Sequence, residues 1–169
     1  MLRYYELGVI PGLLQTEEYA RSVLDDGWRT QADVEERLAD RMDRQTAILD
    51  RDGPVQFAFI LDAAALRCGP VEVAKRQLQH LVDVGERSNV SLQVVPDSAG
   101  VHPGRSGSFA LALFEDGRLV GYQEDLLEGS VISESAWLMI LSRTWQAVSV
   151  VALPADQSRD LLLKMVNDL

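Results

Sequence analysis

Three consecutive segments decide the fold of this chain: the run Val55-Gln56-Phe57-Ala58-Phe59-Ile60-Leu61, the segment 71–86, and the run Val90-Ser91-Leu92-Gln93-Val94-Val95. The first run is short, apolar and rich in β-branched and aromatic residues, which is typical of a buried strand. Segment 71–86 has apolar residues at helical spacing, and the last run alternates like a strand. Strand, long helix and strand in this order favour two parallel strands joined by a right-handed crossover.

Two helices are predicted before this unit. Residues 4–12 are expected to form an extended arm that ends in the Pro11-Gly12 turn. Thr16 is placed to cap a short helix, because its hydroxyl can accept a hydrogen bond from the first turn. A longer helix is expected over 30–49, where apolar residues recur at steps of three and four.

The C-terminal half adds a hairpin and two more helices. Residues 97–107 contain glycine, proline and serine and predict a loop. Alternating residues on both sides of Asp116-Gly117 predict a β-hairpin over 109–122. Helices are expected over 134–151 and from Pro154 to the C-terminus.

These elements predict an α+β fold in a single domain, residues 1–169. An N-terminal helical pair (residues 1–52) is expected to pack on a small mixed β-sheet in the α/β part (residues 53–169), with the other helices covering one face. The length of 169 residues agrees with one domain.

Composition excludes several classes of function. The net charge of −10 disfavours direct nucleic-acid binding, because phosphate is also negative. A single cysteine, Cys68, forms no internal disulfide and suits a reducing compartment, so we expect a cytoplasmic protein. No segment resembles a membrane span or a signal peptide. Neither histidine has a second ligand at a metal-binding spacing, so no metal and no cofactor is predicted.

Loop 97–107 is the strongest candidate for a functional loop, since His102 and Arg105 offer hydrogen-bond donors. We expect a pocket to be bordered by this loop and by the start of the first helix, although a plain connection is the alternative. Tyr122 and Glu124 at the end of a predicted strand could also face a ligand.

Two other patterns are interpreted as structural. Trp137 and Trp145 could line a pocket with Tyr122, but aromatic residues at helical spacing usually fill a core. The line Arg37, Arg41 and Arg44 could meet an acidic partner. Because aspartates stand beside these arginines, a solvated and self-neutralised face is the preferred interpretation.

The string Ile10-Pro11-Gly12-Leu13-Leu14-Gln15-Thr16, followed by Glu17-Glu18-Tyr19-Ala20-Arg21, resembles the opening motif of an actinobacterial domain of unknown biochemical function. That domain normally follows an Xre-type helix-turn-helix. Further similarities extend over nearly the whole chain: Arg41 to Gln45, Leu61-Asp62, Gln77-Leu78, Gly100 with His102, Tyr122-Gln123-Glu124 and Ser158. The chain departs from the pattern in two places, because no helix-turn-helix precedes Tyr4 and the connection Arg67 to Pro70 is compact.

The resemblance implies a sensor or partner-binding domain of an antitoxin-like or pathway-associated transcriptional regulator, without DNA binding of its own. Its partners would be a small-molecule ligand or a small partner protein, and a homodimer is possible. The alternative is a stand-alone small-molecule enzyme of specialised metabolism, in which Glu124 and His102 would supply acid and base. The candidate ligand-binding residues are Gln15, Tyr19, His102, Arg105, Tyr122 and Glu124.

Overall fold

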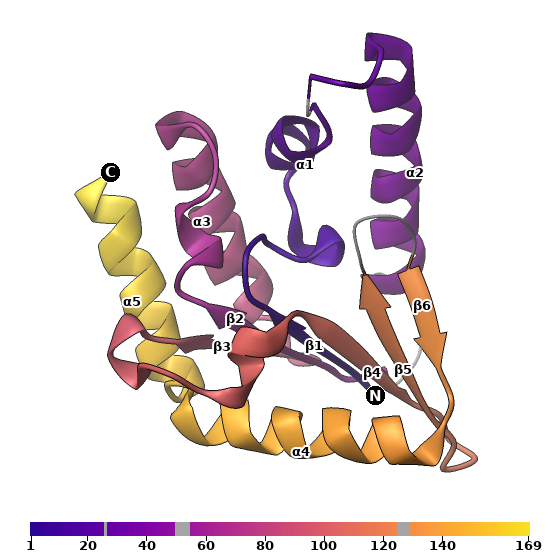
Figure 1. Cartoon of the computed structure of the whole chain (residues 1–169). Coiled ribbons are helices and arrows are strands. Elements are labelled where there is room, and N and C mark those ends of the chain that lie inside the picture. Colours follow the sequence, from indigo (N-terminus) through magenta and orange to yellow (C-terminus); the bar gives the residue numbers. More distant parts are fainter. Residues whose placement is uncertain (26, 50–54, 125–128) are drawn as a thin grey trace.

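A six-stranded mixed sheet runs through the computed structural model, which describes residues 1–25, 27–49, 55–124 and 129–169. The strand order is β3-β2-β1-β4-β5-β6 (Figure 1). The strands are β1 (Leu2–Glu6), β2 (Phe57–Asp62), β3 (Val90–Val95), β4 (Phe109–Leu113), β5 (Leu119–Glu124) and β6 (Gly129–Ile132). The three strands β3, β2 and β1 are mutually parallel, and the others are antiparallel to their neighbours.

Helices flank the sheet on both faces. They are α1 (Glu17–Leu24), α2 (Gln31–Leu49), α3 (Val71–Gly85), α4 (Ser135–Val151) and α5 (Ala155–Asp168). Four short 3-10 turns complete the chain: η1 (Gly12–Leu14), η2 (Ala65–Arg67), η3 (Asp97–Ala99) and η4 (Pro103–Ser106). The molecule is therefore a single α+β domain, as the sequence predicts.

The crossover that decides the fold is present. β2 and β3 are parallel neighbours joined through α3, with Phe59 opposite Leu92. Thr16 caps α1 by accepting a hydrogen bond from the backbone N–H of Tyr19. The predicted hairpin forms between β4 and β5. The helix and strand types follow from local periodicity, because in each of these segments local preference and tertiary packing agree.

The predicted arm at residues 4–12 is extended, but its first part is a central strand. β1 lies between β2 and β4 and pairs with both. β6 was also not predicted, and it extends the sheet beyond β5. The partners of β1 lie far away in the sequence. β6 has only four residues. Local patterns therefore give little sign of either strand.

The remaining helices do not cover one face only, which corrects that part of the prediction. α3 and α5 pack with Phe59, Leu92 and their neighbours on one face. α4 packs on the opposite face against Tyr5 and Phe109, and lies below the sheet in Figure 1. α1 and α2 lie above it.

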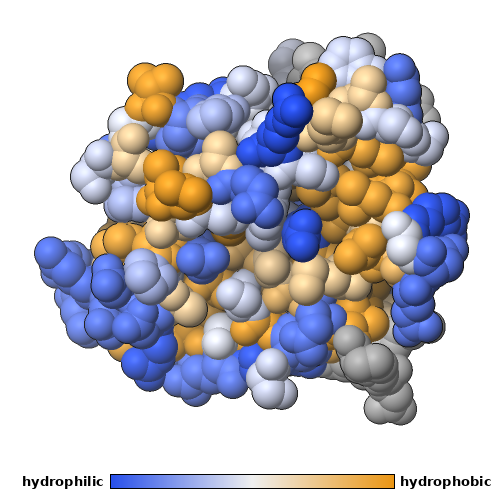
Figure 2. Space-filling view, turned by 90° about the horizontal axis from the view of Figure 1, so that it is seen from below, coloured by the Kyte–Doolittle hydropathy of each residue, from blue (hydrophilic) through white to orange (hydrophobic). Residues whose placement is uncertain are grey.

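The exposure of residues on α4 corrects the prediction that Trp137 and Trp145 both fill the core. Trp145 is only 8% exposed and belongs to the core, whereas Trp137 is 56% exposed. Met139 and Ile140 of the same helix are also exposed. Hydrophobic residues are prominent in the view from below, the side on which α4 lies (Figure 2). Trp137 and Trp145 therefore do not share one buried face.

The expected boundary between the helical pair and the α/β part, at residues 52 and 53, lies outside the described residues. Within the described ranges no single helix is long and apolar enough to cross a membrane. α4 and α5 reach that length and composition only as a pair, bent by 68° at the break between them.

Candidate functional site

Three glutamine side chains hold the segment 10–16 in place. Gln15 is buried, and its Nε2 donates to the carbonyl oxygen of Ile10 at 2.7 Å. Gln77 of α3 donates to the carbonyl of Leu14 at 2.6 Å and accepts from the backbone N–H of Thr16 at 2.7 Å. Gln45 of α2 donates to the carbonyls of Gly12 and Gln15, the latter at 2.9 Å. The segment is thereby fixed to two helices.

A cleft of about 470 Å³ opens between this segment, α2 and the sheet. Its apolar wall includes Val9, Ile10, Leu13, Val23 and Ile48. α2 packs against α1 and η1, so its inner side remains above the sheet and the cleft lies between them. A volume of this size is in the range of small-molecule binding sites, about 300–1,000 Å³.

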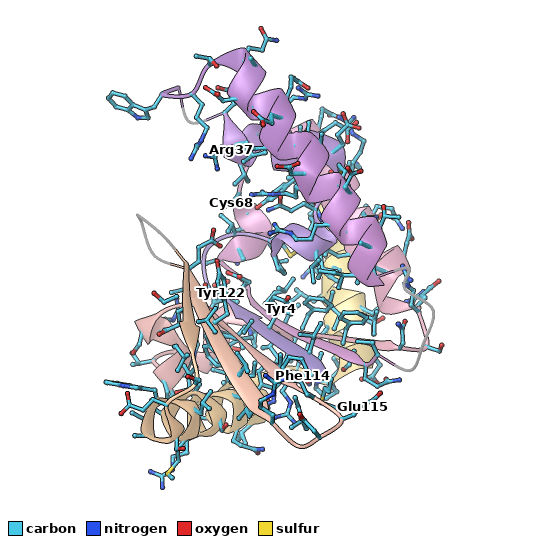
Figure 3. The ribbon with its side chains drawn as sticks, turned by 90° about the vertical axis from the view of Figure 1, so that its right-hand side faces the viewer. Tyr4, Arg37, Cys68, Phe114, Glu115 and Tyr122 are labelled. Carbon is cyan, nitrogen blue, oxygen red and sulfur yellow. The ribbon has the colours of Figure 1, made fainter. Side chains whose placement is uncertain are left out.

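The floor of the cleft is one face of the sheet. Tyr4 of β1 is opposite Ala110 of β4, which is opposite Tyr122 of β5, so these three side chains share a face. Tyr4 and Tyr122 both lie on the part of the sheet toward α2 (Figure 3). Because side chains alternate along a strand, Glu6 and Glu124, two residues further on, share this face. Ala110 is small and leaves space between the two tyrosines.

Two arginines of α2 line the opposite side of the cleft. Arg41 is partly buried, and its Nη1 donates to Oε1 of Gln15 at 2.7 Å. Arg44 is exposed and forms no hydrogen bond or ion pair with any described residue. A Cβ atom on Gly12 would lie 3.7 Å from Arg44 Nη2 and 3.8 Å from Arg41 Nε, so both guanidinium groups lie beside the Pro11-Gly12 turn.

The cleft perturbs the ionisation of its carboxyl and phenol groups. Burial raises the pKa of Glu6 to about 7, with a hydrogen bond from Ser108 acting in the opposite direction and the Glu124 carboxylate adding to the rise. Burial also raises the pKa of Tyr4, while the nearby Arg44 lowers it. Burial lowers the pKa of Arg41, and Glu124 opposes this change. A carboxyl group with a pKa near 7 in a cleft is typical of a binding or catalytic site.

A second polar cluster lies on the other face of the sheet, toward α4. His102 is 6% exposed, and its Nε2 lies 3.3 Å from Oδ2 of Asp62, without the geometry of a hydrogen bond. Arg105 Nη2 lies 3.6 Å from the same oxygen. Tyr5 packs edge-on against the His102 ring. Among the described residues, the Tyr5 hydroxyl has no hydrogen-bond partner.

The region that supplies the cleft and its supports matches a known family model. Residues 1–164 match the model of a domain of unknown function, DUF5753. The chain belongs to this family. No curated protein and no solved structure matches the chain. The match confirms the predicted resemblance to a domain of unknown function, and it covers all the strands and almost all the helices of this DUF5753 domain.

The structure divides the six predicted ligand-binding residues of the DUF5753 domain among three places. Gln15, Tyr122 and Glu124 line the cleft. His102 and Arg105 belong to the cluster on the opposite face. Tyr19 is buried beneath the segment 10–16, and its hydroxyl accepts a hydrogen bond from the backbone N–H of Ile10. Loop 97–107 and the cleft are therefore separated by the sheet.

Four charged or phenolic residues of the cleft were not among the sequence candidates: Tyr4, Glu6, Arg41 and Arg44. A signal for the arginines was present, because their spacing places them on one line of a helix. Interpreting that line as solvated and self-neutralised was incorrect for Arg41, which is partly buried and bound to Gln15. Tyr4 and Glu6 could be placed only by knowing that β1 is a strand of the sheet.

Neither a metal site nor the predicted catalytic pair is assembled in the described ranges. No three side chains of histidine, cysteine, aspartate or glutamate come together there as a metal-binding group. Glu124 and His102, the candidates for acid and base, lie on different faces of the sheet. The cleft itself offers two cations, two carboxyl groups and two phenols, a set suited to holding a polar ligand.

Proposed function

We propose that this chain is the sensor or partner-binding domain of an Xre-type transcriptional regulator, and that the cleft binds a small molecule. The observation that carries the proposal is the cleft of about 470 Å³, in which charged side chains of α2 and of the sheet face the same space. The resemblance of the Ile10–Thr16 motif to actinobacterial regulators supports the regulatory setting. The acidic net charge supports a role without direct DNA binding, and the single cysteine supports a cytoplasmic location.

The position of α2 gives the sensor a physical basis. α2 contacts the rest of the domain through α1 and η1, through the hydrogen bonds of Gln45 and Arg41, and at its C-terminal end through Leu49, whose carbonyl accepts from Arg87. A ligand that contacts both α2 and the sheet would stabilise one arrangement of the two. Such a differential contact is what allows a ligand to shift a conformational equilibrium.

The enzyme alternative receives less support from the same geometry. Acid–base catalysis requires both groups within reach of one substrate. Glu124 and His102 lie on opposite faces of the sheet, so one bound molecule does not contact both. The binding function is therefore the one that we propose.

To test this, the purified chain is incubated with a metabolite extract of an actinobacterium. Unbound compounds are removed by gel filtration. The protein is then denatured, and the compounds that it releases are identified by mass spectrometry. Ala110→Phe fills the floor of the cleft between Tyr4 and Tyr122. Ala47→Phe, on the exposed side of α2, is the matched control. We expect the wild type and Ala47→Phe to release the same compound and Ala110→Phe, folded by circular dichroism, to release none. Equal release by all three proteins would exclude the cleft as the site.

A further inference from the structure

Basic and acidic side chains face each other across the cleft without pairing. Arg41 and Arg44 project from α2, and Glu6 and Glu124 belong to the sheet. No nitrogen of either arginine lies within 4.0 Å of either carboxylate in the described part of the chain. The groups nevertheless interact at longer range, because burial lowers the pKa of Arg41 and the Glu124 carboxylate opposes this change.

The architecture keeps these charges apart. Arg41 is tied to Gln15, and Gln45 fixes the same helix to the Pro11-Gly12 turn, so α2 does not settle onto the sheet. Glu6 lies at the end of β1 and is hydrogen-bonded by Ser108. Surface cations and carboxylates that can reach one another usually form pairs of small net value. Here Arg41 and the helix α2 are held in position, and the four charged groups stay unpaired across the cleft.

The space between the charges is lined by aromatic and apolar groups. The rings of Tyr4 and Tyr122 form the floor, and Tyr4 is fixed by stacking on Phe59 with ring centroids 5.3 Å apart. Ile10 and Ile48 belong to the wall. Aromatic faces attract cations as well as apolar groups, so the tyrosines can support a protonated amine beside a carboxylate.

We infer that the cleft binds a zwitterion of short-peptide size, with its carboxylate at Arg41 and Arg44 and its protonated amine at Glu6 and Glu124. This inference rests on the proposed function and adds the chemical class of the ligand. Two arginines present several N–H groups to one carboxylate, and charge-assisted hydrogen bonds of this kind are about twice as strong as neutral ones. A ligand with both charges would satisfy both sides of the cleft at once. It would thereby connect α2 to the sheet.

The test uses three pools of tripeptides with a central phenylalanine: one with free termini, one N-acetylated and one C-amidated. Retention by the full chain is measured by ultrafiltration and mass spectrometry, followed by calorimetry on the best-retained peptide. We expect the free pool to bind, and removal of either terminal charge to weaken binding about tenfold, equivalent to about 1.4 kcal/mol.

Variants identify which side of the cleft recognises which terminus. In Arg44→Gln, amidation of the peptide should weaken binding less than in the wild type, because Arg41 alone then faces the carboxylate. In Glu124→Gln, acetylation should likewise weaken binding less, because only Glu6 remains on that side. Arg37→Gln and Glu115→Gln, both exposed and outside the cleft lining, are matched controls that should bind like the wild type. Arg44 and Glu124 are suitable because neither forms a hydrogen bond or ion pair with a described residue.

Three results would overturn the inference: equal binding of all three pools, binding that Arg44→Gln and Glu124→Gln leave unchanged, or no retention of any peptide. The proposed function would survive the last result if Ala110→Phe still abolished release of a compound from the metabolite extract. Failure of the ligand class is therefore distinguishable from failure of the cleft as a ligand site.

Discussion

The side-chain amide of Gln77 takes the place of a neighbouring strand as the hydrogen-bonding partner of the segment before α1. Segment 10–16 is not paired with a strand, yet the backbone groups of Leu14 and Thr16 need partners where water is excluded. Gln77, only 1% exposed, supplies an acceptor to Thr16 and a donor to Leu14. One side chain therefore satisfies two backbone groups and connects α3 to the wall of the cleft.

Gln77→Ala should lower the free energy of unfolding by about 2–4 kcal/mol, because it leaves two backbone groups without partners, each costing about 1–3 kcal/mol. Gln79→Ala is the control, since Gln79 is exposed and bonds only to Asp83 of its own helix. The control should change the free energy by no more than about 0.5 kcal/mol. Urea denaturation of both variants measures the difference, and equal values would contradict the role of Gln77.

The ionisation of Glu6 makes the stability of the protein depend on pH. Its pKa is raised from 4.5 to about 7 by burial, so the folded protein retains a proton that the unfolded chain has lost in this interval. The contribution of Glu6 to the free energy of unfolding therefore falls as the pH rises from about 4.5 to about 7 and stays low above it. Below about pH 4.5 both states are protonated and the contribution is constant.

Glu6→Gln removes this ionisation and keeps the shape of the side chain. We compare the free energy of unfolding of the variant with that of the wild type at each pH. We expect this difference to be about 1–2 kcal/mol more in favour of the variant at pH 8 than at pH 4. Glu36→Gln, exposed on α2, should show no such pH-dependent difference. Denaturation curves across the pH range provide the measurement. A difference that does not grow with pH would show that Glu6 titrates normally.

At the scale of elements, loop 97–107 is bound to the face of the sheet that carries α4. Gly104 of η4 lies against Tyr5 and Val148, and a Cβ atom there would come 2.5 Å from Tyr5 Cζ and 2.7 Å from Val148 Cγ1. The close packing of Gly104 against Tyr5 and Val148 holds the loop that carries His102 and Arg105 in place. The loop thus has a packing role distinct from the cleft.

Gly104→Ala should destabilise the protein by about 1–3 kcal/mol, because the added methyl group requires movement of Tyr5 and Val148. Gly8→Ala is the matched control, since a Cβ atom at Gly8 meets nothing within 4 Å. Thermal or urea unfolding of the two variants distinguishes crowding from a general effect of replacing glycine. If Gly104→Ala were as stable as the wild type, the loop would be able to move away from Tyr5 and Val148 without loss of unfolding free energy, which would contradict this prediction.

Elements with strong local periodicity could be predicted, and elements defined by distant partners could not. The long stripe of α2 and the alternation of β3 are properties of the segments themselves. β1 has only five residues, and its place between β2 and β4 depends on residues more than fifty positions away. The alternation of β1 decides that Tyr4 faces the cleft and Tyr5 faces α4. Without it, residues of two separate places were combined into one candidate site.

At the scale of the whole molecule, charge is distributed unevenly around a net value of −10. Arg41 and Arg44 face a cleft that also contains Glu6 and Glu124. We expect the chain alone to show no tight binding of duplex DNA at about 150 mM salt, because phosphate is repelled by the net charge. Fluorescence anisotropy with a labelled duplex measures this, and a submicromolar affinity at that salt would contradict the proposed division of roles.

A crystal structure of the chain after incubation with the metabolite extract would locate the ligand. We expect a bound molecule between α2 and the sheet, within hydrogen-bond distance of Arg44 on one side and Glu124 on the other. A molecule bound only beside Asp62 and His102, or a cleft closed by direct pairing of Arg44 with Glu6 or Glu124, would contradict this expectation.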